Sequence, residues 1–473
     1  MRHDLINPRS PHDIALICED GRTLRYSALL AELDRIGHWF ESRQLVFIFG
    51  RNDLASLLVY LAALGRDAVP LMLNGDAKAE HMPGLIEAFS PQFVFTGSFD
   101  ADCRAWEPVA EEGECRLYRN PASTNPTLHP ELAFLSATSG STGSPKLVRL
   151  SMANLRANAA AIADYLEITP DDRAVTSLPI SYSYGLSVVN SHLFAGASLV
   201  LTDRSLMDTA FWELARSHAV TSFAGVPYHY EMLLRLGLDR LNVPAIRKMT
   251  QAGGRLDPDK MHKVVEACAA QGIRFWTMYG QTEASPRISY VPPEETLNKL
   301  GSIGRAIPGG RMWVCNEAGE DITACHTVGE LVYEGPNVCL GYAENGCHLA
   351  RDDENRGILH TGDLARCDED GYFFIEGRLS RFLKIYGTRI SLDRIEKAVA
   401  ERGFDCVAHG QDDRLIVSAV EAEDLEPVAL RREVAAFAGV NAAAVTVSVF
   451  PEIPRLPSGK VDYPCLTRHI DRM

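Results

Sequence analysis

Ser136-Ala-Thr-Ser-Gly-Ser-Thr-Gly-Ser-Pro-Lys146 is the stretch of this sequence that says most about fold and chemistry. It follows a short apolar run, Leu132 to Leu135, which predicts a buried strand. Gly140 and Gly143 allow the backbone after that strand to turn tightly and to bring its N–H groups close to a ligand. The serine and threonine hydroxyls add further donors, and Lys146 adds a positive charge. Such a loop suits a polyphosphate.

A flexible glycine/serine linker is the alternative interpretation of this stretch, and composition alone does not separate the two. A linker, however, would need neither a strand before it nor a single lysine to close it. The spacing also differs from the Walker pattern, which requires Gly-Lys-Ser/Thr after four spacer residues. The sequence therefore predicts a phosphate-binding loop of another kind.

The bulk properties are those of a large globular protein. The chain has 473 residues, of which 46% are hydrophobic and 23% charged, enough for a large core and more than one domain. A net charge of −15 argues against a general nucleic-acid or membrane binder. The apolar run Leu54–Leu64 is too short to span a bilayer, and the N-terminus lacks the apolar core of a signal peptide. Eleven scattered cysteines without a C-x-x-C pair favour reduced thiols, so a cytoplasmic location is expected.

Strand-like and helical patterns alternate through most of the chain. The alternation is typical of an α/β protein with parallel or mixed sheets flanked by helices. Ligands of open α/β sheets bind at the carboxyl ends of strands. Three expected strand ends carry glycine or polar clusters, at 136–146, 252–254 and 279–283. These three clusters predict a ligand site at the carboxyl ends of the strands, without reference to any protein family.

The pattern changes near Ile375-Glu-Gly-Arg378. The segment Leu379–Arg389 is rich in cationic side chains, and the rest of the chain predicts a small α+β unit. We therefore expect a large N-terminal domain at 1–377 and a small, mobile C-terminal domain at 378–473.

The order Thr-Ser-Gly-Ser-Thr-Gly-Ser-Pro-Lys, residues 138–146, resembles the signature loop of the adenylate-forming superfamily. That superfamily contains acyl-CoA synthetases, adenylation domains of peptide synthetases and luciferases. Further motifs follow in family order up to residue 460, so the resemblance covers essentially the whole chain. It implies that the nucleotide phosphates are bound by Thr138, Ser139, Gly140, Ser141, Thr142, Gly143 and Lys146.

Tyr279-Gly-Gln-Thr-Glu283 resembles the Tyr-Gly-x-Thr-Glu motif of the superfamily. The resemblance implies that Glu283 holds Mg²⁺, a hard cation that prefers oxygen ligands. It also implies that Thr282 bonds the α-phosphate and that Tyr279 stacks on adenine. The alternative for these five residues alone is a polar turn after a strand.

The resemblance implies that three further motifs contact the nucleoside. His360-Thr-Gly-Asp363 resembles the Thr-Gly-Asp motif, whose aspartate bonds the ribose hydroxyls as a two-acceptor carboxylate can. Gly377-Arg378 resembles the Gly-Arg pair that follows it, and Arg378 would also reach the nucleotide. Gly253 and Gly254 resemble the paired glycines on which adenine lies.

Pro457-Ser-Gly-Lys460 resembles the C-terminal Pro-x-Gly-Lys motif. The resemblance implies that Lys460 bonds both the acid carboxylate and the phosphates, where two anions meet and a cation is needed. On its own, a lysine this close to the C-terminus would be interpreted as a solvated tail residue.

Leu383-Lys-Ile-Tyr-Gly387 resembles the loop that lines a channel for a phosphopantetheine thiol after the small domain has rotated. Lys384 and Gly387 are the candidate residues of this loop. The hinge position, usually aspartate or lysine in the family, is Ser380 here, which is a departure from the pattern. A small polar residue can still absorb a backbone rotation.

The acid substrate is only partly constrained. Leu178–Ser187 aligns with the stretch before the acid pocket, and Gly185 stands where amino-acid-activating domains carry an aspartate for the α-ammonium group. Since a buried ammonium without a counter-charge is costly, we expect an acid without an α-amino group. Candidate pocket walls, each of which could equally be ordinary core, are Tyr182, Tyr184, Phe223, Tyr228 and Met278.

The resemblance as a whole implies an enzyme with ATP and Mg²⁺ as cofactors. It would join a carboxylic acid to ATP, release pyrophosphate, and pass the acyl group to a thiol of CoA or of a separate carrier protein's phosphopantetheine arm. These two acceptors remain equally open. An amine or hydroxyl acceptor is a further alternative, and an ATP-binding pseudoenzyme is disfavoured because Lys460, Glu283 and Asp363 are all present.

Overall fold

A computed structural model describes residues 3–75, 82–97, 106–137, 146–238, 242–455 and 461–470. The chain packs into two compact units. The first unit comprises Met1–Met312 with Val332–Leu359, and the second comprises Trp313–Leu331 with His360–Met473. The packing thus groups residues 360–377 with the C-terminal segment. The expected domain boundary at 377/378 stays a prediction.

An eight-stranded sheet forms one layer of the first unit, in the order β20-β9-β8-β4-β3-β5-β7-β6. Its central strands β8, β4, β3 and β5 run parallel, and antiparallel strands complete both edges. The strands are β3 (Leu45–Gly50), β4 (Val69–Asn74), β5 (Phe93–Thr96), β6 (Glu107–Glu112), β7 (Cys115–Arg119), β8 (Leu132–Ala137), β9 (Leu147–Ser151) and β20 (Gly341–Ala343).

A nine-stranded sheet forms the other layer, in the order β16-β15-β14-β13-β12-β10-β11-β1-β2, and is parallel from β14 to β1. Its strands are β1 (Ile14–Cys18), β2 (Thr23–Arg25), β10 (Arg173–Val175), β11 (Ser198–Leu201), β12 (Ser222–Gly225), β13 (Lys248–Gln251), β14 (Arg274–Gly280), β15 (Arg287–Val291) and β16 (Arg305–Ala306).

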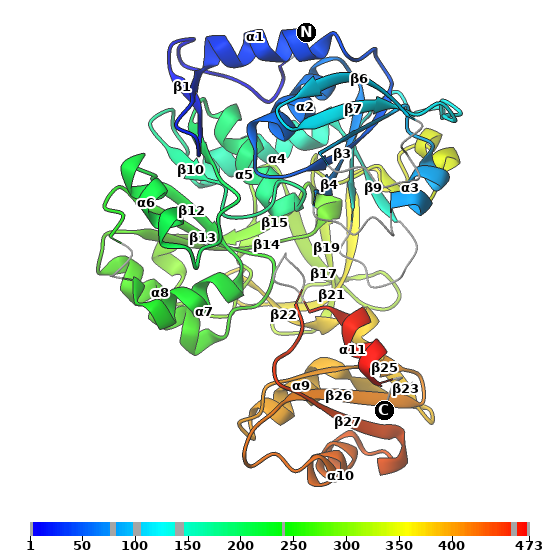
Figure 1. Cartoon of the computed structure of the whole chain (residues 1–473). Helices are drawn as coiled ribbons and strands as arrows, with labels where there is room; N and C mark the ends of the chain where they lie inside the picture. Colours follow the sequence, from blue (N-terminus) through cyan, green and yellow to red (C-terminus); the bar gives the residue numbers. More distant parts are fainter. Residues whose placement is uncertain are drawn as a thin grey trace. The chain divides into compact units, whose positions relative to one another are not determined.

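Helices fill the space between the two sheets and cover their outer faces (Figure 1). One core joins both sheets through α1 (Tyr26–Gly37), α2 (Leu54–Gly65), α4 (Met152–Tyr165) and α5 (Ser183–Phe194). The other face of the nine-stranded sheet is covered by α6 (Thr209–Ser217), α7 (Pro227–Leu236) and α8 (Pro258–Ala269). Helix α3 (Met82–Phe89) packs on the eight-stranded sheet. The predicted α/β class is confirmed.

Local sequence signals explain where several helices begin. Asp53 caps α2 by accepting a hydrogen bond from the Ser56 backbone N–H. Asp257 caps α8, and Pro258 occupies its first turn. Ser151 and Asn154 form a reciprocal capping box at the start of α4. These caps set the direction of each helix as it leaves the strand before it.

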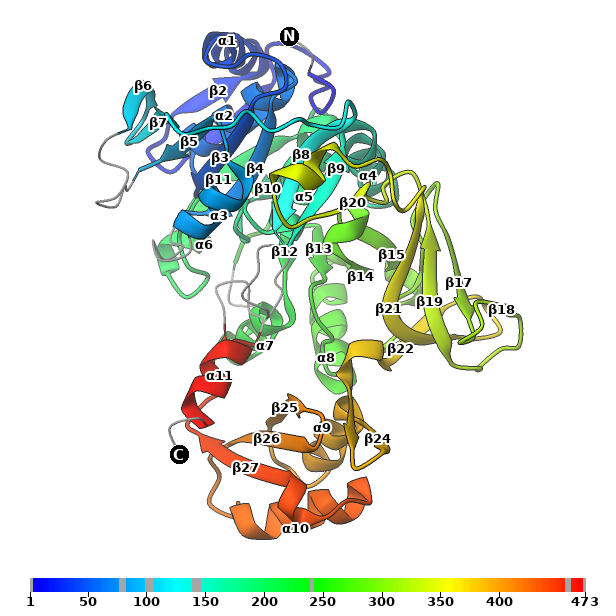
Figure 2. The same cartoon turned by 90° about the vertical axis from the view of Figure 1, so that its right-hand side faces the viewer.

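A five-stranded sheet follows in the order β18-β17-β19-β21-β22 (Figure 2). Most of it belongs to the second unit, and the division between the units falls within β17, β19 and β21. These strands are β17 (Arg311–Cys315), β18 (Asp321–Ile322), β19 (Gly329–Glu334), β21 (Ile358–Cys367) and β22 (Phe373–Arg378). A hairpin follows, formed by β23 (Phe382–Ile385) and β24 (Thr388–Ser391).

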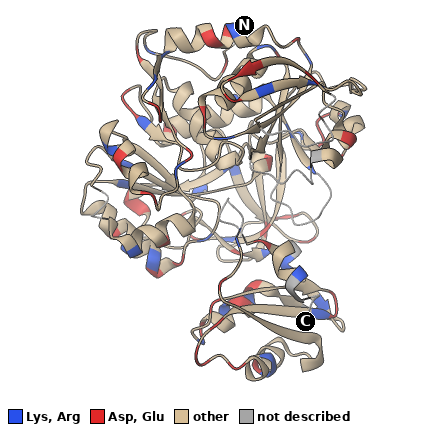
Figure 3. Cartoon of the chain, in the orientation of Figure 1, with Lys and Arg blue, Asp and Glu red and all other residues tan. Residues whose placement is uncertain are grey.

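The C-terminal segment is the α+β unit that the sequence predicts. Its three-stranded sheet contains β25 (Cys406–Gln411), β26 (Arg414–Val420) and β27 (Val445–Phe450). Helices α9 (Leu392–Ala400) and α10 (Pro427–Ala438) pack with that sheet around one core, and α11 (Tyr463–Ile470) follows. Acidic and basic residues are interspersed along both units (Figure 3). Within the described ranges, no helix is long and apolar enough to cross a membrane.

His192 of α5 makes the stability of the first unit depend on pH. Burial lowers the pKa of His192 to about 4, from an ordinary value of 6.5. Between these two pH values the unfolded chain binds more protons than the folded chain. Stability contributed by neutral His192 is therefore complete above pH 6.5 and is lost as the pH falls towards 4, by about 3 kcal/mol.

We predict that the free energy of unfolding, measured by urea denaturation, falls less between pH 7 and pH 5 in His192→Gln than in the wild type. Two other histidines also have a pKa lowered to about 4, so part of the dependence should remain. Equal pH dependence in the two proteins would contradict the assignment to His192.

Candidate active site

Lys146 lies directly before β9, at the end of the predicted phosphate loop. Its Nζ stands 3.7 Å from the centroid of the Tyr342 ring, a cation–π contact. Tyr342 belongs to β20, which pairs antiparallel with the start of β9 and so brings this ring to Lys146. The remaining predicted loop residues, 138–143, lie outside the described residues.

Glu283 meets the same tyrosine. It lies in the short 3-10 helix η4 (Thr282–Ala284), and the Tyr342 hydroxyl donates to its Oε1 at 2.6 Å. Burial and the neighbouring Glu283 charge raise the pKa of Tyr342, so the phenol stays protonated and donates. One ring therefore connects the lysine that closes the phosphate loop with the carboxylate predicted to hold Mg²⁺. Sequence reasoning missed Tyr342, because no motif contains it.

Two buried asparagines fix the segment after Glu283. The side-chain amides of Asn158 and Asn337 each donate to the backbone carbonyls of Ala284 and Arg287, at 2.6–3.3 Å. The backbone N–H of Cys339 donates to the Glu283 carbonyl at 2.8 Å. Neither asparagine was predicted, since both act on main-chain atoms that any residue could supply.

The other members of the motif lie at the end of β14. The Thr282 hydroxyl is 3.2 Å from the Ser183 hydroxyl at the start of α5. Tyr279 is half-buried, and its hydroxyl accepts a hydrogen bond from the Gln281 amide at 3.1 Å. The stacking of Tyr279 on adenine stays a prediction.

Gly253 and Gly254 follow β13 and leave space that other residues would fill. Gly253 has φ +82°, and a Cβ built there would lie 2.5 Å from the Tyr182 hydroxyl oxygen. A Cβ at Gly254 would lie 3.2 Å from Pro227 Cγ. Tyr182, a predicted pocket wall, thus lies against the predicted adenine-binding glycines. Burial raises the pKa of Tyr182, so its hydroxyl stays neutral.

The remaining predicted pocket walls differ in their surroundings. The Tyr184 hydroxyl contacts the carbonyl and hydroxyl of Thr250, at 3.0 and 2.9 Å. Phe223 is buried among aromatic rings, and Met278 is buried with its sulfur 3.0 Å from the Tyr165 hydroxyl. Tyr228, in contrast, is 44% exposed.

Gly185 has no room for a side chain. A Cβ built there would overlap the carbonyl oxygen of Pro179. Gly185, which the sequence aligns with the aspartate position of amino-acid-activating domains, therefore could not be replaced by an aspartate without a backbone shift.

The second unit places Asp363 and Arg378 side by side. They are paired residues of β21 and β22, and Arg378 Nε lies 2.8 Å from Asp363 Oδ1. Asp363 is only 2% exposed, whereas the Arg378 side chain is 57% exposed. The two residues predicted to contact the nucleoside from this unit thus share one ion pair.

Lys384 lies in β23, and its backbone N–H donates to Asp412 at 2.8 Å. Gly387 has φ +87° in the tight turn of the β23–β24 hairpin, which favours glycine there. The backbone of Ser380 lies in a single 3-10 turn, η7 (Leu379–Arg381), between β22 and β23. Lys460 lies outside the described residues, so its predicted role is untested.

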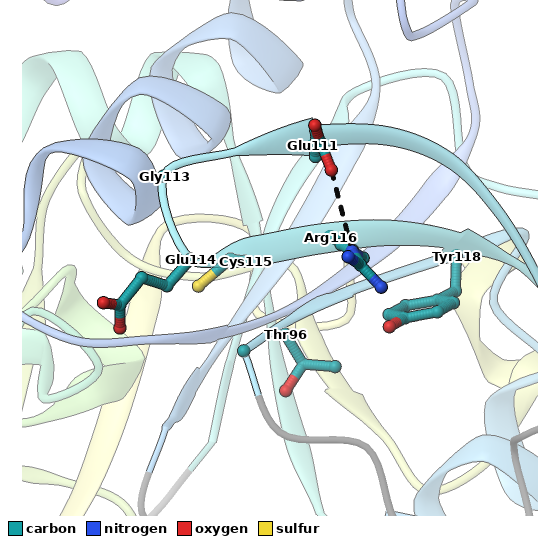
Figure 4. Close-up of a pocket in the computed structure, with 8 residues that line it drawn as sticks. Thr96, Glu111, Gly113, Glu114, Cys115, Arg116 and Tyr118 are labelled. Atoms are coloured by element: carbon teal, nitrogen blue, oxygen red, sulfur yellow. Dashed lines mark ion pairs between the residues drawn. The ribbon is translucent and has the colours of Figure 1, made fainter.

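A hollow of about 320 Å³ lies elsewhere in the first unit, at the β5–β7 strands (Figure 4). Glu111 and Arg116 form an exposed ion pair at its rim, 3.7 Å apart. None of the described residues that line it is a predicted site residue. The predicted site residues around Glu283 thus lie apart from this hollow.

The fold and these strand-end clusters define a nucleotide-binding α/β enzyme of the adenylate-forming class. The family profile described as "AMP-binding enzyme" matches residues 6–343. The chain belongs to this family, which confirms the resemblance inferred from the motifs.

Two of the relatives are CoA ligases by name. The chain is 29% identical over 307 residues to indoleacetate–CoA ligase of Aromatoleum aromaticum, across 64% of this chain and 58% of that ligase. It is 31% identical over 359 residues to sulfoacetate–CoA ligase of Cupriavidus necator, across 74% of this chain and 69% of that ligase. The matches thus span roughly three-fifths to two-thirds of these ligases.

The fold is also that of a solved synthetase. The structure of O-succinylbenzoate CoA synthetase from Bacillus subtilis in complex with AMP superposes with a TM-score of 0.76 at 22% identity. The superposition covers 97% of this chain and 96% of that one.

We predict that Tyr342→Phe weakens binding of magnesium–ATP by about 10-fold, because it removes the hydroxyl that positions the Glu283 carboxylate but keeps the ring beside Lys146. Isothermal titration calorimetry with and without Mg²⁺ would measure this, and Tyr118→Phe in β7 is the matched control. An unchanged affinity in Tyr342→Phe would contradict the positioning role.

Proposed function

We propose that this chain activates a small carboxylic acid with ATP and then transfers the acyl group to a thiol. The main support is that Lys146 and Glu283 contact the same side chain, Tyr342: the lysine lies over its ring, and the carboxylate accepts from its hydroxyl. A cation and a carboxylate that lie far apart in sequence are thereby gathered beside the predicted phosphate loop. Family membership and the ligase relatives support the same reaction.

In the first step, one carboxylate oxygen of the acid attacks the α-phosphorus of ATP. The bond to the bridging oxygen breaks, and pyrophosphate leaves. Lys146 and the loop hold the outer phosphates, and Lys460 orients the reacting oxygens. Asp363 binds the ribose hydroxyls.

Glu283 suits Mg²⁺ by its chemistry, since carboxylate oxygens are preferred ligands of this cation. The neutral Tyr342 phenol orients the Glu283 carboxylate by a hydrogen bond. It carries no charge of its own that would compete with Mg²⁺ for that carboxylate. Bound Mg²⁺ would offset the negative charge of the leaving pyrophosphate.

In the second step, a thiol attacks the carbonyl carbon of the acyl-adenylate, and AMP leaves. The β23–β24 hairpin, in which Lys384 and Gly387 are exposed, is the proposed channel element. CoA is the acceptor named for the ligase relatives, and a carrier protein's phosphopantetheine arm offers the same thiol. Both remain within the proposal.

The acid is proposed to lack an α-amino group. Support comes from Gly185, where the backbone of Pro179 leaves no room for an ammonium-binding carboxylate. The two relatives are named for an aromatic acid and for a sulfonated acid, so likeness alone does not select the acid.

Lys460→Ala should slow adenylate formation by about 100-fold or more, because it removes a preorganised charge partner where negative charge builds up. It should largely spare thioester formation from preformed acyl-adenylate. Pyrophosphate release and thioester formation are measured separately, with Lys397→Ala on α9 as the control. Equal losses in both half-reactions would refute this division of roles.

Wild-type chain supplied with L-amino acids should give no ATP–pyrophosphate exchange above background. The physical reason is the cost of burying an α-ammonium group without a counter-charge. Robust exchange with one L-amino acid would overturn this part of the proposal, while leaving acid activation intact.

A further inference from the structure

Arg287 is a buried cation without a described anionic partner. It opens β15, four residues after Glu283, and is 3% exposed. Its Nε has no hydrogen-bond partner, and no ion pair joins it to any carboxylate in the described part of the chain. A buried charge that lacks a counter-charge is expensive, so its retention in the interior requires an explanation.

Aromatic rings account for part of its environment. The Arg287 guanidinium lies 4.0 Å from the centroid of the Tyr184 ring, a cation–π contact. Burial raises the pKa of Tyr165 to about 12, and the nearby charge of Arg287 opposes that shift. Burial also raises the pKa of Tyr182, and the charge of Arg287 opposes that shift too. These phenols are neutral, however, and supply no negative charge.

Two asparagine side chains hold the backbone of Arg287 in place. Its carbonyl accepts hydrogen bonds from the side chains of Asn158 and Asn337, at 3.2 and 2.8 Å. The same asparagines hold Ala284, next to Glu283. The position of Arg287 is thus tied to the motif at which ATP is proposed to react.

A small internal cavity adjoins the side chain. It offers about 20 Å³ to water, which is room for roughly one molecule. Its polar lining residues are Ser191, His192, Ser222, Thr250 and Arg287. One oxygen atom of an anionic group takes up about the space of that water, and Arg287 is the one cationic residue among the described residues that line this otherwise largely apolar space.

The cavity and the predicted acid pocket share walls. Tyr184 contacts Arg287 by its ring and Thr250 by its hydroxyl, and Thr250 lines the cavity. Phe223, another predicted wall, also lines it. Arg287 is therefore placed where the far end of an acid would lie, on the inner side of the pocket.

We propose that Arg287 binds a second anionic group of the substrate, so that the acid activated by this chain is a small dianionic acid, either a dicarboxylate or a carboxylate with a sulfonate. One carboxylate reacts with ATP, and the second anionic group pairs with the guanidinium. This proposal rests on the proposed acid activation and names the class of its substrate.

The test uses butanoate, butanedioate and 3-sulfopropanoate, the last two with the same two methylene groups between their anionic groups, and benzoate and phthalate as an aromatic pair. Acid-dependent pyrophosphate release by the full-length wild type is expected to favour a dianionic acid over its monoanionic counterpart by about 10-fold or more in kcat/KM. Comparison of the two dianionic aliphatic acids decides between a carboxylate and a sulfonate as the second group.

Arg287→Gln is expected to lower kcat/KM for the preferred dianionic acid by about 100-fold and to change that for the monoanionic acid far less. Arg287→Lys should keep part of the preference, because it keeps the charge. The matched control is Arg305→Gln, at an exposed arginine on the neighbouring strand β16, which should leave the preference unchanged.

The outcomes separate the two proposals. If wild-type chain activates only monoanionic acids, or if Arg287→Gln keeps the preference, the role of Arg287 is overturned while acid activation stands. If no acid releases pyrophosphate although calorimetry shows ATP binding, the proposed function itself fails. Should Arg287→Gln not fold, the wild-type preference together with Arg287→Lys still decides.

Discussion

The hydrogen bond from the Tyr342 hydroxyl to Glu283 is the contact on which the proposed site depends. It joins η4, at the end of one sheet, to β20, at the edge of the other. Lys146 lies over the same ring, so the last residue of the predicted phosphate loop and the carboxylate predicted to hold Mg²⁺ contact a single side chain. If the two sheets packed differently, the carboxylate and the lysine would not be neighbours. The packing of helices α4 and α5 between the sheets is therefore a condition for the chemistry as well as for stability.

Asn158 and Asn337 connect the segment next to Glu283 with the buried Arg287. Asn158 and Asn337 satisfy buried carbonyls after Glu283, which is the usual requirement for buried polar backbone. Because they fix the start of β15, they also fix Arg287 on the inner side of the pocket. The same asparagines thus hold both the segment next to Glu283, where ATP is proposed to react, and Arg287, which is proposed to recognise the acid.

The sequence alone was enough to predict the α/β class and the C-terminal α+β unit. These follow from local patterns that involve neighbouring residues. Glu283 and the Asp363–Arg378 pair could be named because they lie in short motifs. Tyr342, Asn337 and Arg287 could not, because their roles come from contacts between segments far apart in the chain. A buried arginine after a strand end carries no local signal that its charge lacks a partner.

ATP–pyrophosphate exchange with a panel of carboxylic acids is the most direct test of whether this chain activates an acid with ATP. The account predicts that the wild-type chain catalyses exchange only when a suitable acid is present, and that Glu283→Gln abolishes most of that exchange while the chain stays folded. Binding of ATP with no exchange for any acid in the panel would contradict the account and would make this chain a nucleotide-binding protein without ligase activity.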